Sequence, residues 1–409
     1  MMTSEDQLVT LTVGGAAWPF NVPSEKIVAL SRGAEPGTAG SPTDMLNAAL
    51  EGPIGLGAPL QRAVTPDDQV AIVVDERVPQ LVPILIGLLQ HLVEAHVELK
   101  NVTLLVPATS LQQLWLDDLP DELGDIHLDV HDPANRDKLA YLATTKGERR
   151  VYLNRKIVEA DLLIVLTGRG FDPKLGYSGG AAFLFPQFSD AETIAGYPKE
   201  FKTASRPEDP NPLRTEAKEI LKLLGAPFLV QIIEGVGDTV AEVFVGLPVS
   251  TSDGAASLKK HWLGRVERKA DLVIAAVSGS DGRITFRDLA TAAATGRRAL
   301  ESGGRLVLLT TAAPRLDDSG DLLLKVEEPA VALKRIAAAK PDDAMPGTFW
   351  AFAAKKVSLY VAAGWPDELI EELFATPVHT VGEVQRLIDA AESVLFLQDA
   401  HKMFVEVGA

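Results

Sequence analysis

Residues Leu162–Tyr197 read LLIVLTGRGFDPKLGYSGGAAFLFPQFSDAETIAGY. The stretch opens with Leu-Leu-Ile-Val-Leu, directly after the polar Asp161, and such a run of β-forming residues predicts a buried strand. Ligands bind outside the carboxyl ends of parallel strands in α/β folds. The stretch therefore predicts an α/β sheet and also the place of a binding site. A long structural loop rich in glycine is the alternative interpretation of the residues after the strand.

Five glycines follow this strand within thirteen residues: Gly168, Gly170, Gly176, Gly179 and Gly180. Glycine lets the backbone take positive φ and approach a ligand closely. The run Tyr177-Ser178-Gly179-Gly180 adds hydroxyl groups and backbone N–H groups, which suit an anionic oxygen. We therefore predict that these four residues bind a ligand.

The same α/β pattern precedes the stretch. Residues 69–75 and 102–106 predict strands, and residues 79–96 between them predict an amphipathic helix that begins at Pro79. A strand–helix–strand unit of this length implies a parallel sheet. Arg77 lies just past the first strand, where ligands bind in such folds, so we predict that it binds an anion. An ion pair with surface carboxylates is the alternative.

Strands and helices alternate again after residue 255, up to a last short strand at residues 394–397. Between the two halves, residues 246–254 read GLPVSTSDG, a segment of glycine, proline and serine without periodicity that predicts a domain boundary. Residues 8–22 predict a β-hairpin at the start of the chain. We predict two α/β domains with mostly parallel sheets, comprising residues 1–250 and residues 251–409.

The composition excludes several classes of function. The chain has 409 residues and a formal net charge of −17, which argues against nucleic acids and anionic membranes as partners, since both need a basic surface. It contains no cysteine, which rules out disulfides and thiolate metal ligands. No apolar run reaches the ~18–20 residues of a membrane helix, and the acidic first residues do not resemble a signal peptide. A cytoplasmic protein is expected.

The glycine stretch resembles the nickel-pincer lactate racemase family. Residues 176–180 are similar to the family's Gly-Phe-Ser-Gly-Gly loop, residues 151–161 to its approach to that strand, and residues 185–194 to the segment that follows. Arg77 is in register with the arginine of the family's Asp-x-Thr-Arg-Pro motif. The resemblance implies two α/β domains with the active site in a cleft between them. It also implies a small 2-hydroxy acid as substrate and a nickel-pincer nucleotide as cofactor.

The residues that carry the family's reaction are replaced in this sequence. Ala182 stands where the resemblance places the cofactor-tethering lysine, and Pro198 where it places the metal-binding histidine. One acid–base histidine corresponds to Asp172, or to Lys174 after a shift of two, and the other to Ser110. In the second half, Asp288 and Thr291 replace the family's substrate-facing glutamine and lysine.

None of the seven histidines lies at a matching place, so neither a metal site nor a covalently tethered cofactor is predicted. Asp172, Lys174 and Ser110 are the candidate catalytic residues. The candidate ligand-binding residues are Arg77, Tyr177, Ser178, Gly179, Gly180 and Asp288.

Two functions remain open. The first is a divergent racemase or epimerase of a small 2-hydroxy acid with altered site chemistry. The second is a catalytically inactive homologue that binds a small anionic ligand in the cleft. Loss of several reactive groups together favours a departure from the family reaction, whereas Arg77 and the Ser-Gly-Gly run favour a retained ligand site.

Overall fold

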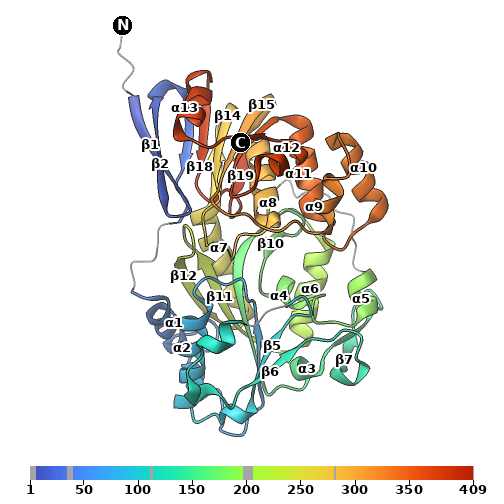
Figure 1. Ribbon diagram of the computed structural model, residues 1–409. Helices are drawn as coiled ribbons and strands as arrows, with labels where there is room; N and C mark the ends of the chain where they lie inside the picture. The colour runs from blue at the N-terminus through green and yellow to red at the C-terminus, as the bar shows by residue number, and fades with distance from the viewer. Residues whose placement is uncertain (1–5, 35–39, 111–113, 197–205, 281, 409) are drawn as a thin grey trace. The chain divides into compact units, whose positions relative to one another are not determined.

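The computed structural model describes residues 6–34, 40–110, 114–196, 206–280 and 282–408, and the chain forms two compact units (Figure 1). The central unit comprises Pro36–Gly235 and Thr239–Lys260. The terminal unit comprises Met1–Glu35, Val236–Asp238 and His261–Ala409. Each unit contains a mostly parallel sheet and helices, which confirms the predicted α/β class. No helix in the described ranges is both long and apolar enough to span a membrane.

The central sheet has the strand order β12-β11-β9-β4-β5-β6, and β10 pairs with β9 outside this path. Strands β11, β9, β4, β5 and β6 run parallel, whereas β12 and β10 are antiparallel to their partners. The parallel strands share one carboxyl edge, where α/β proteins bind ligands. The strands are β4 (Val70–Val74), β5 (Val102–Val106), β6 (His127–Val130), β9 (Leu162–Asp172), β10 (Gly176–Ser178), β11 (Phe228–Glu234) and β12 (Val240–Gly246).

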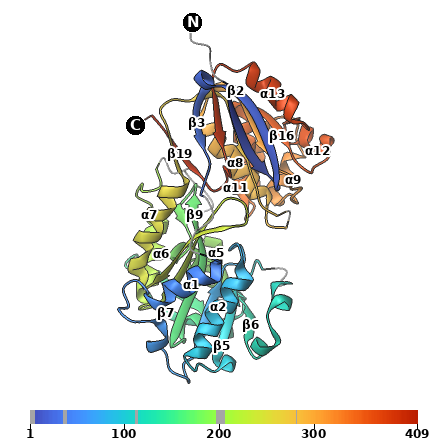
Figure 2. The same cartoon turned by 90° about the vertical axis from the view of Figure 1, so that its left-hand side faces the viewer.

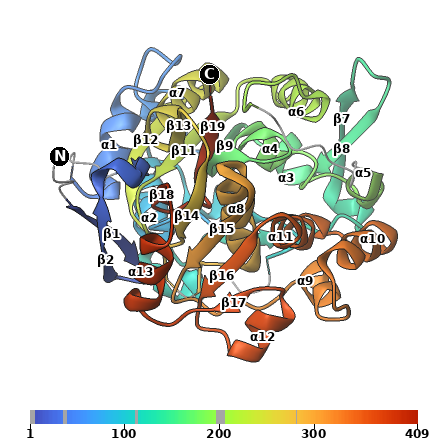
Figure 3. The ribbon, with the colours of Figure 1, turned by 90° about the horizontal axis from the view of Figure 1, so that it is seen from above.

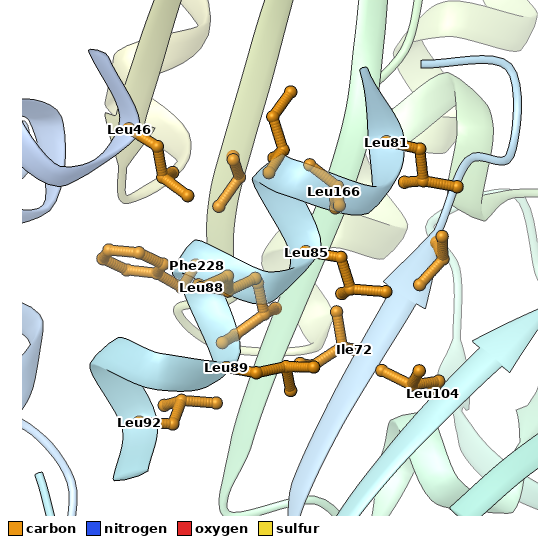
Figure 4. Close-up of a cluster of buried hydrophobic side chains, with 14 of the residues drawn as sticks. Leu46, Ile72, Leu81, Leu85, Leu88, Leu89, Leu92, Leu104, Leu166 and Phe228 are labelled. Carbon is orange, nitrogen blue, oxygen red and sulfur yellow. The ribbon is translucent and has the colours of Figure 1, made fainter. Parts of the chain in front are cut away.

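Helices α1 (Pro42–Glu51) and α2 (Leu81–Glu94) cover one face of this sheet (Figure 2). Leucines recur along α2 at helical spacing, so one stripe of the helix is apolar. Figure 4 shows Leu85, Leu88 and Leu92 from α2 beside side chains of the strands, including Ile72. Fully burying one such side chain stabilises the fold by about 1.5–3 kcal/mol.

The opposite face is covered by α3 (Arg155–Val158), α4 (Ala181–Leu184) and α6 (Pro212–Leu223). Because successive residues of a strand point to opposite faces, Val165 faces α4 and α6 while Ile164 and Leu166 face α2. The antiparallel pair β7 (Leu139–Thr144) and β8 (Arg150–Asn154), helix α5 (Ala191–Gly196) and helix α7 (Thr251–Trp262) complete this part of the chain.

The sheet of the terminal unit has the order β17-β16-β15-β14-β18-β3, and all of its strands are parallel. Figure 3 shows α8 alongside β14 and β15. The sheet strands are β3 (Ile27–Ser31), β14 (Ala270–Ala276), β15 (Leu300–Leu309), β16 (Ser358–Ala362), β17 (Thr376–Pro377) and β18 (Val394–Leu397). The helices are α8 (Phe286–Arg298), α9 (Asp318–Leu323), α10 (Pro329–Ala339), α11 (Ala344–Lys356), α12 (Asp367–Glu372) and α13 (Val381–Asp389). A separate pair joins β13 (Leu263–Val266) to β19 (Phe404–Val407).

The predicted division at residue 250 differs from the observed one. The expected hairpin is present as β1 (Asp6–Val13) and β2 (Ala16–Pro23), but it packs in the core of the terminal unit together with β14 and β18. Strand β3 then pairs with β18 at the other end of the sequence. The boundary also falls at residues 260–261, inside α7, and not in the segment 246–254. Local composition could not predict this division, because it depends on pairing between strands that lie far apart in the sequence.

Candidate functional site

Two carboxyl groups face the same small space at the carboxyl edge of the central sheet. Asp75 follows the last residue of β4, Glu234 ends β11, and Gly168 lies between them in β9. A Cβ on Gly168 would lie 3.7 Å from Glu234 Oε1 and 3.9 Å from Asp75 Oδ2. The glycine therefore leaves a gap that both carboxyl groups border.

Asp75 is held by backbone donors and has an altered acidity. Its Oδ1 accepts a hydrogen bond from Arg77 N at 3.1 Å and its Oδ2 one from Gly168 N at 3.4 Å. Burial raises the pKa of Asp75, and the charge of Glu234 raises it further, whereas the Arg77 guanidinium opposes the shift. Arg77 itself is exposed at this edge. An acid of raised pKa, a second carboxylate and an exposed guanidinium can together bind an anion and hold or move a proton.

The expected glycine loop after Leu166 is instead a β-hairpin. Strand β9 continues to Asp172, and β10 folds back on it with Tyr177 opposite Phe171, their ring centroids 5.8 Å apart. Asp172 Oδ1 accepts hydrogen bonds from Lys174 N at 2.8 Å and Leu175 N at 2.6 Å, so this carboxylate caps the turn. The strand continues because aromatic side chains pair across it.

The hairpin is fixed to the segment that precedes α6. Tyr177 Oη donates to Glu208 Oε1 at 2.8 Å, and burial, followed by this bond, raises the pKa of Tyr177. Arg214 Nη1 donates to Leu175 O at 2.7 Å and to Pro207 O at 2.6 Å. Asn211 Nδ2 donates to Lys174 O at 2.8 Å. These contacts give the hairpin residues a structural role, and a catalytic role for Asp172 and Lys174 stays a prediction.

In the Ser-Gly-Gly run, the backbone carbonyl groups of Ser178 and Gly179 accept hydrogen bonds from the buried side chain of Arg169. Arg169 Nη1 donates to Ser178 O at 2.7 Å and Gly179 O at 3.2 Å, and Gly180 N donates to Thr167 Oγ1 at 3.0 Å. The N–H group of Gly180, expected to bind an anionic oxygen, is thus engaged within the protein.

The other predicted residues belong to other elements or lie outside the described residues. Ser110 N donates to Pro107 O at 2.9 Å in the loop after β5. Asp288 is 8% exposed, and its Oδ2 accepts hydrogen bonds from Thr285 N and Oγ1 in a capping box at the start of α8 in the terminal unit. Pro198 lies outside the described residues, and ligand binding by Asp288 stays a prediction.

His131 directly follows β6 at the same sheet edge as Asp75, but its ring contacts other groups of the protein. It is 1% exposed, its Nε2 lies 2.8 Å from Ser189 O, and its Nδ1 lies 3.2 Å from Asn154 Nδ2. Burial lowers the pKa of His131, which favours the neutral ring. Over the described parts of the chain, no three side chains of His, Asp or Glu are grouped so that they could hold a metal ion.

Sequence reasoning missed three residues of this region: Asp75, Glu234 and Arg169. The first two are polar residues at the carboxyl ends of apolar strands, a position that could have marked them. Arg169 points to the same face of β9 as Val165, so its charged side chain lies in the buried layer between the sheet and α4 and α6.

Comparisons with known proteins agree on one relationship. Residues 13–208 match the family described as the lactate racemase N-terminal domain. The chain is 21% identical to a lactate racemase of Thermoanaerobacterium thermosaccharolyticum, over 95% of each protein. The structure of the apoprotein of lactate racemase from that organism superimposes with a TM-score of 0.80 at 18% identity, over 98% of this chain and 100% of the other. A crystal structure from Thermotoga maritima matches with a TM-score of 0.62 at 11% identity, over 91% of this chain and all of that one.

Proposed function

Because this chain belongs to the lactate racemase-like family, we propose that it binds a small 2-hydroxy acid at the carboxyl edge of its central sheet, without the family's tethered nickel nucleotide. The observation that carries the proposal is the convergence of Arg77, Asp75 and Glu234 around the gap left by Gly168. Fold similarity alone does not fix function, so the proposal depends on these side chains.

Each group has a part suited to such a ligand. The exposed guanidinium of Arg77 binds the carboxylate of the acid in a forked, two-bond arrangement. Glu234 accepts a hydrogen bond from the 2-hydroxyl group. Asp75, whose pKa is raised chiefly by burial, stays protonated over a wider pH range than an exposed aspartate and therefore tolerates the anion nearby.

The side chains that are present do not fit the nickel-pincer nucleotide. Residue 182, where the resemblance places the tethering lysine, is an alanine in the first turn of α4 and offers no nucleophilic group. Both ring nitrogens of His131, which lies near the edge, are within hydrogen-bonding distance of other groups of the protein. The proposed function therefore does not use that cofactor.

An isomerase with altered chemistry is the second candidate, and the environment of Asp75 favours it. A carboxyl group of raised pKa beside a second carboxylate is an arrangement that assigns one group as acid and the other as base. In this reading Glu234 removes a proton from one face of the substrate carbon and Asp75 delivers one. Arg77 would then stabilise the negative charge that develops on the carboxylate.

Binding is tested by titration calorimetry with D-lactate and L-lactate. Arg77→Gln should weaken binding by at least tenfold, whereas Arg136→Gln, at an exposed arginine elsewhere in the central unit, should leave it unchanged. Equal affinities for wild type and Arg77→Gln would refute the site. The absence of the tethered nickel nucleotide is tested on protein purified from a host that makes this cofactor. Its metal content and intact mass are measured, and bound nickel with an added nucleotide mass would contradict the proposal.

Catalysis is tested separately by incubating metal-free protein with one lactate enantiomer in D₂O. Deuterium incorporation at carbon 2 that disappears in Asp75→Asn would establish the isomerase. Lactate binding without deuterium incorporation would leave the binding function alone.

A further inference from the structure

Arg169 is a buried cation on the face of the central sheet that α4 and α6 cover. It is 5% exposed and points to the opposite side from Gly168, its neighbour in β9. No carboxylate within the described residues forms an ion pair with it. Burial lowers the pKa of Arg169 to about 10, so the guanidinium still carries its charge at neutral pH. Buried charges are normally paired, because desolvation of a lone charge costs several kcal/mol.

The hydrogen bonds of Arg169 leave one edge of the guanidinium without a partner. The hydrogen bonds to Ser178 O and Gly179 O both use Nη1. Nε is buried and has no acceptor, and Nη2 makes no hydrogen bond in the described part of the chain. Nε and Nη2 form the side of the guanidinium that binds a carboxylate or phosphate through two parallel hydrogen bonds.

A second polar atom without a partner faces the same place. Gln231 is fully buried in β11; its Nε2 donates to Ser250 Oγ at 2.9 Å, while its Oε1 has no donor. A Cβ on Gly254, in α7, would lie 3.0 Å from Gln231 Oε1 and 3.8 Å from Arg169 Nε. Because Gly254 has no side chain, Gln231 Oε1 and Arg169 Nε both lie close to the same point of α7.

The charges around Arg169 also favour an anion. After burial, repulsion from Arg214 and then Arg169 lowers the pKa of Lys218 on α6, so three cations lie near one another. Glu208, the partner of Tyr177 Oη, is also paired with Lys259 at 3.0 Å. This positive region is embedded in a chain whose net charge is −17.

We propose that the Nε–Nη2 edge of Arg169 binds a small oxoanion that also carries a hydroxyl group, with the anionic oxygens on Arg169 and the hydroxyl donating to Gln231 Oε1. Hydrogen phosphate and 2-hydroxy carboxylates share this chemistry, whereas acetate and chloride lack the hydroxyl. The site lies on the opposite face of β9 from the gap at Gly168 and goes beyond the function proposed for Arg77.

The test measures thermal unfolding in sodium phosphate against sodium chloride of equal ionic strength, with calorimetry of phosphate binding. Wild type should gain thermal stability in phosphate beyond the chloride effect. Arg169→Lys, which keeps the charge but loses the fork, should bind phosphate at least tenfold more weakly. Gln231→Glu places a carboxylate beside Nε, so it should raise the melting temperature without phosphate and abolish the response to phosphate.

Arg136→Gln, at an exposed arginine outside both proposed sites, is the control and should keep the full phosphate response. The proposal is overturned if wild type gains nothing from phosphate over chloride, as expected for a space filled by water, or if Arg169→Lys and Gln231→Glu both respond like wild type. Repeating the titrations with lactate and acetate shows whether the site also binds a 2-hydroxy carboxylate and whether binding needs the hydroxyl group. Lactate binding that survives Arg77→Gln but not Arg169→Lys would support this site and overturn the site at Arg77.

Discussion

Replacing Gly179 by alanine tests whether the close contact between Gly179 and Gly168 in β9 stabilises the carboxyl edge of the central sheet. Gly179 has φ +80°, a conformation that costs an alanine about 1–2 kcal/mol. Its added Cβ would also lie well inside van der Waals contact of Gly168 O, a backbone atom that cannot rotate away. Overpacking of this kind costs about 1–3 kcal/mol, so the whole effect is ~2–5 kcal/mol.

Gly225 provides a matched control in the same unit, since it has φ +87° and no atom within 4 Å of an added Cβ. Gly225→Ala should therefore lower the free energy of unfolding only by the cost of the positive φ, about 1–2 kcal/mol. Urea unfolding followed by circular dichroism measures both variants, and hydrogen exchange of peptides from β9 and β11 localises the loss. If Gly179→Ala is no less stable than Gly225→Ala, the contact with Gly168 does not constrain the site.

The remaining predictions concern the terminal unit. Burial, with a smaller contribution from the charge of Asp343, raises the pKa of Asp317 from 3.8 to about 6. A carboxyl group with a raised pKa stabilises the fold when protonated, so the free energy of unfolding should fall by ~1–3 kcal/mol as pH rises from 4 to 6. Asp343→Asn should make this dependence less steep in pH-resolved urea unfolding, and an unchanged slope would contradict a contribution from Asp343. Asp288→Ala should cost ~0.5–2 kcal/mol through loss of the α8 cap while lactate affinity stays the same; a tenfold loss of affinity would instead support its sequence-based assignment to the ligand.

The elements of the central sheet could be predicted because their signals are local. The predicted strand at residues 69–75 is β4 (Val70–Val74), and the predicted helix at residues 79–96 is α2 (Leu81–Glu94). Unbroken apolar runs and helical spacing report burial directly. The hairpin β1–β2 was also predicted from its sequence. Its place in the terminal unit was not predicted, because that place depends on the pairing of β3 with β18.

The chemistry of the site was less accessible to sequence reasoning. Glycine density after residue 166 indicated a loop, yet the cross-strand pair of Phe171 and Tyr177 extends β9 and makes Asp172 a turn cap. Local composition cannot report such a pairing when the partner strand has only three residues. Arg77 was predicted from its position after a strand. Arg169 was not, because its significance lies in the partners it lacks, and only the packed structure reveals these.

The pairing of β3 with β18 has a consequence for synthesis on the ribosome. Strand β3 begins at residue 27 and its partner begins at residue 394, so the first strand of that sheet waits for almost the whole chain to be translated. At ~5–20 residues per second this delay is roughly 20–70 s. The central unit is complete long before, and its fold can form while the earliest segment still has an unpaired, partly apolar edge. During those seconds the nascent N-terminal segment lacks its partner strand, and a message truncated before residue 394 would leave that strand edge unpaired permanently.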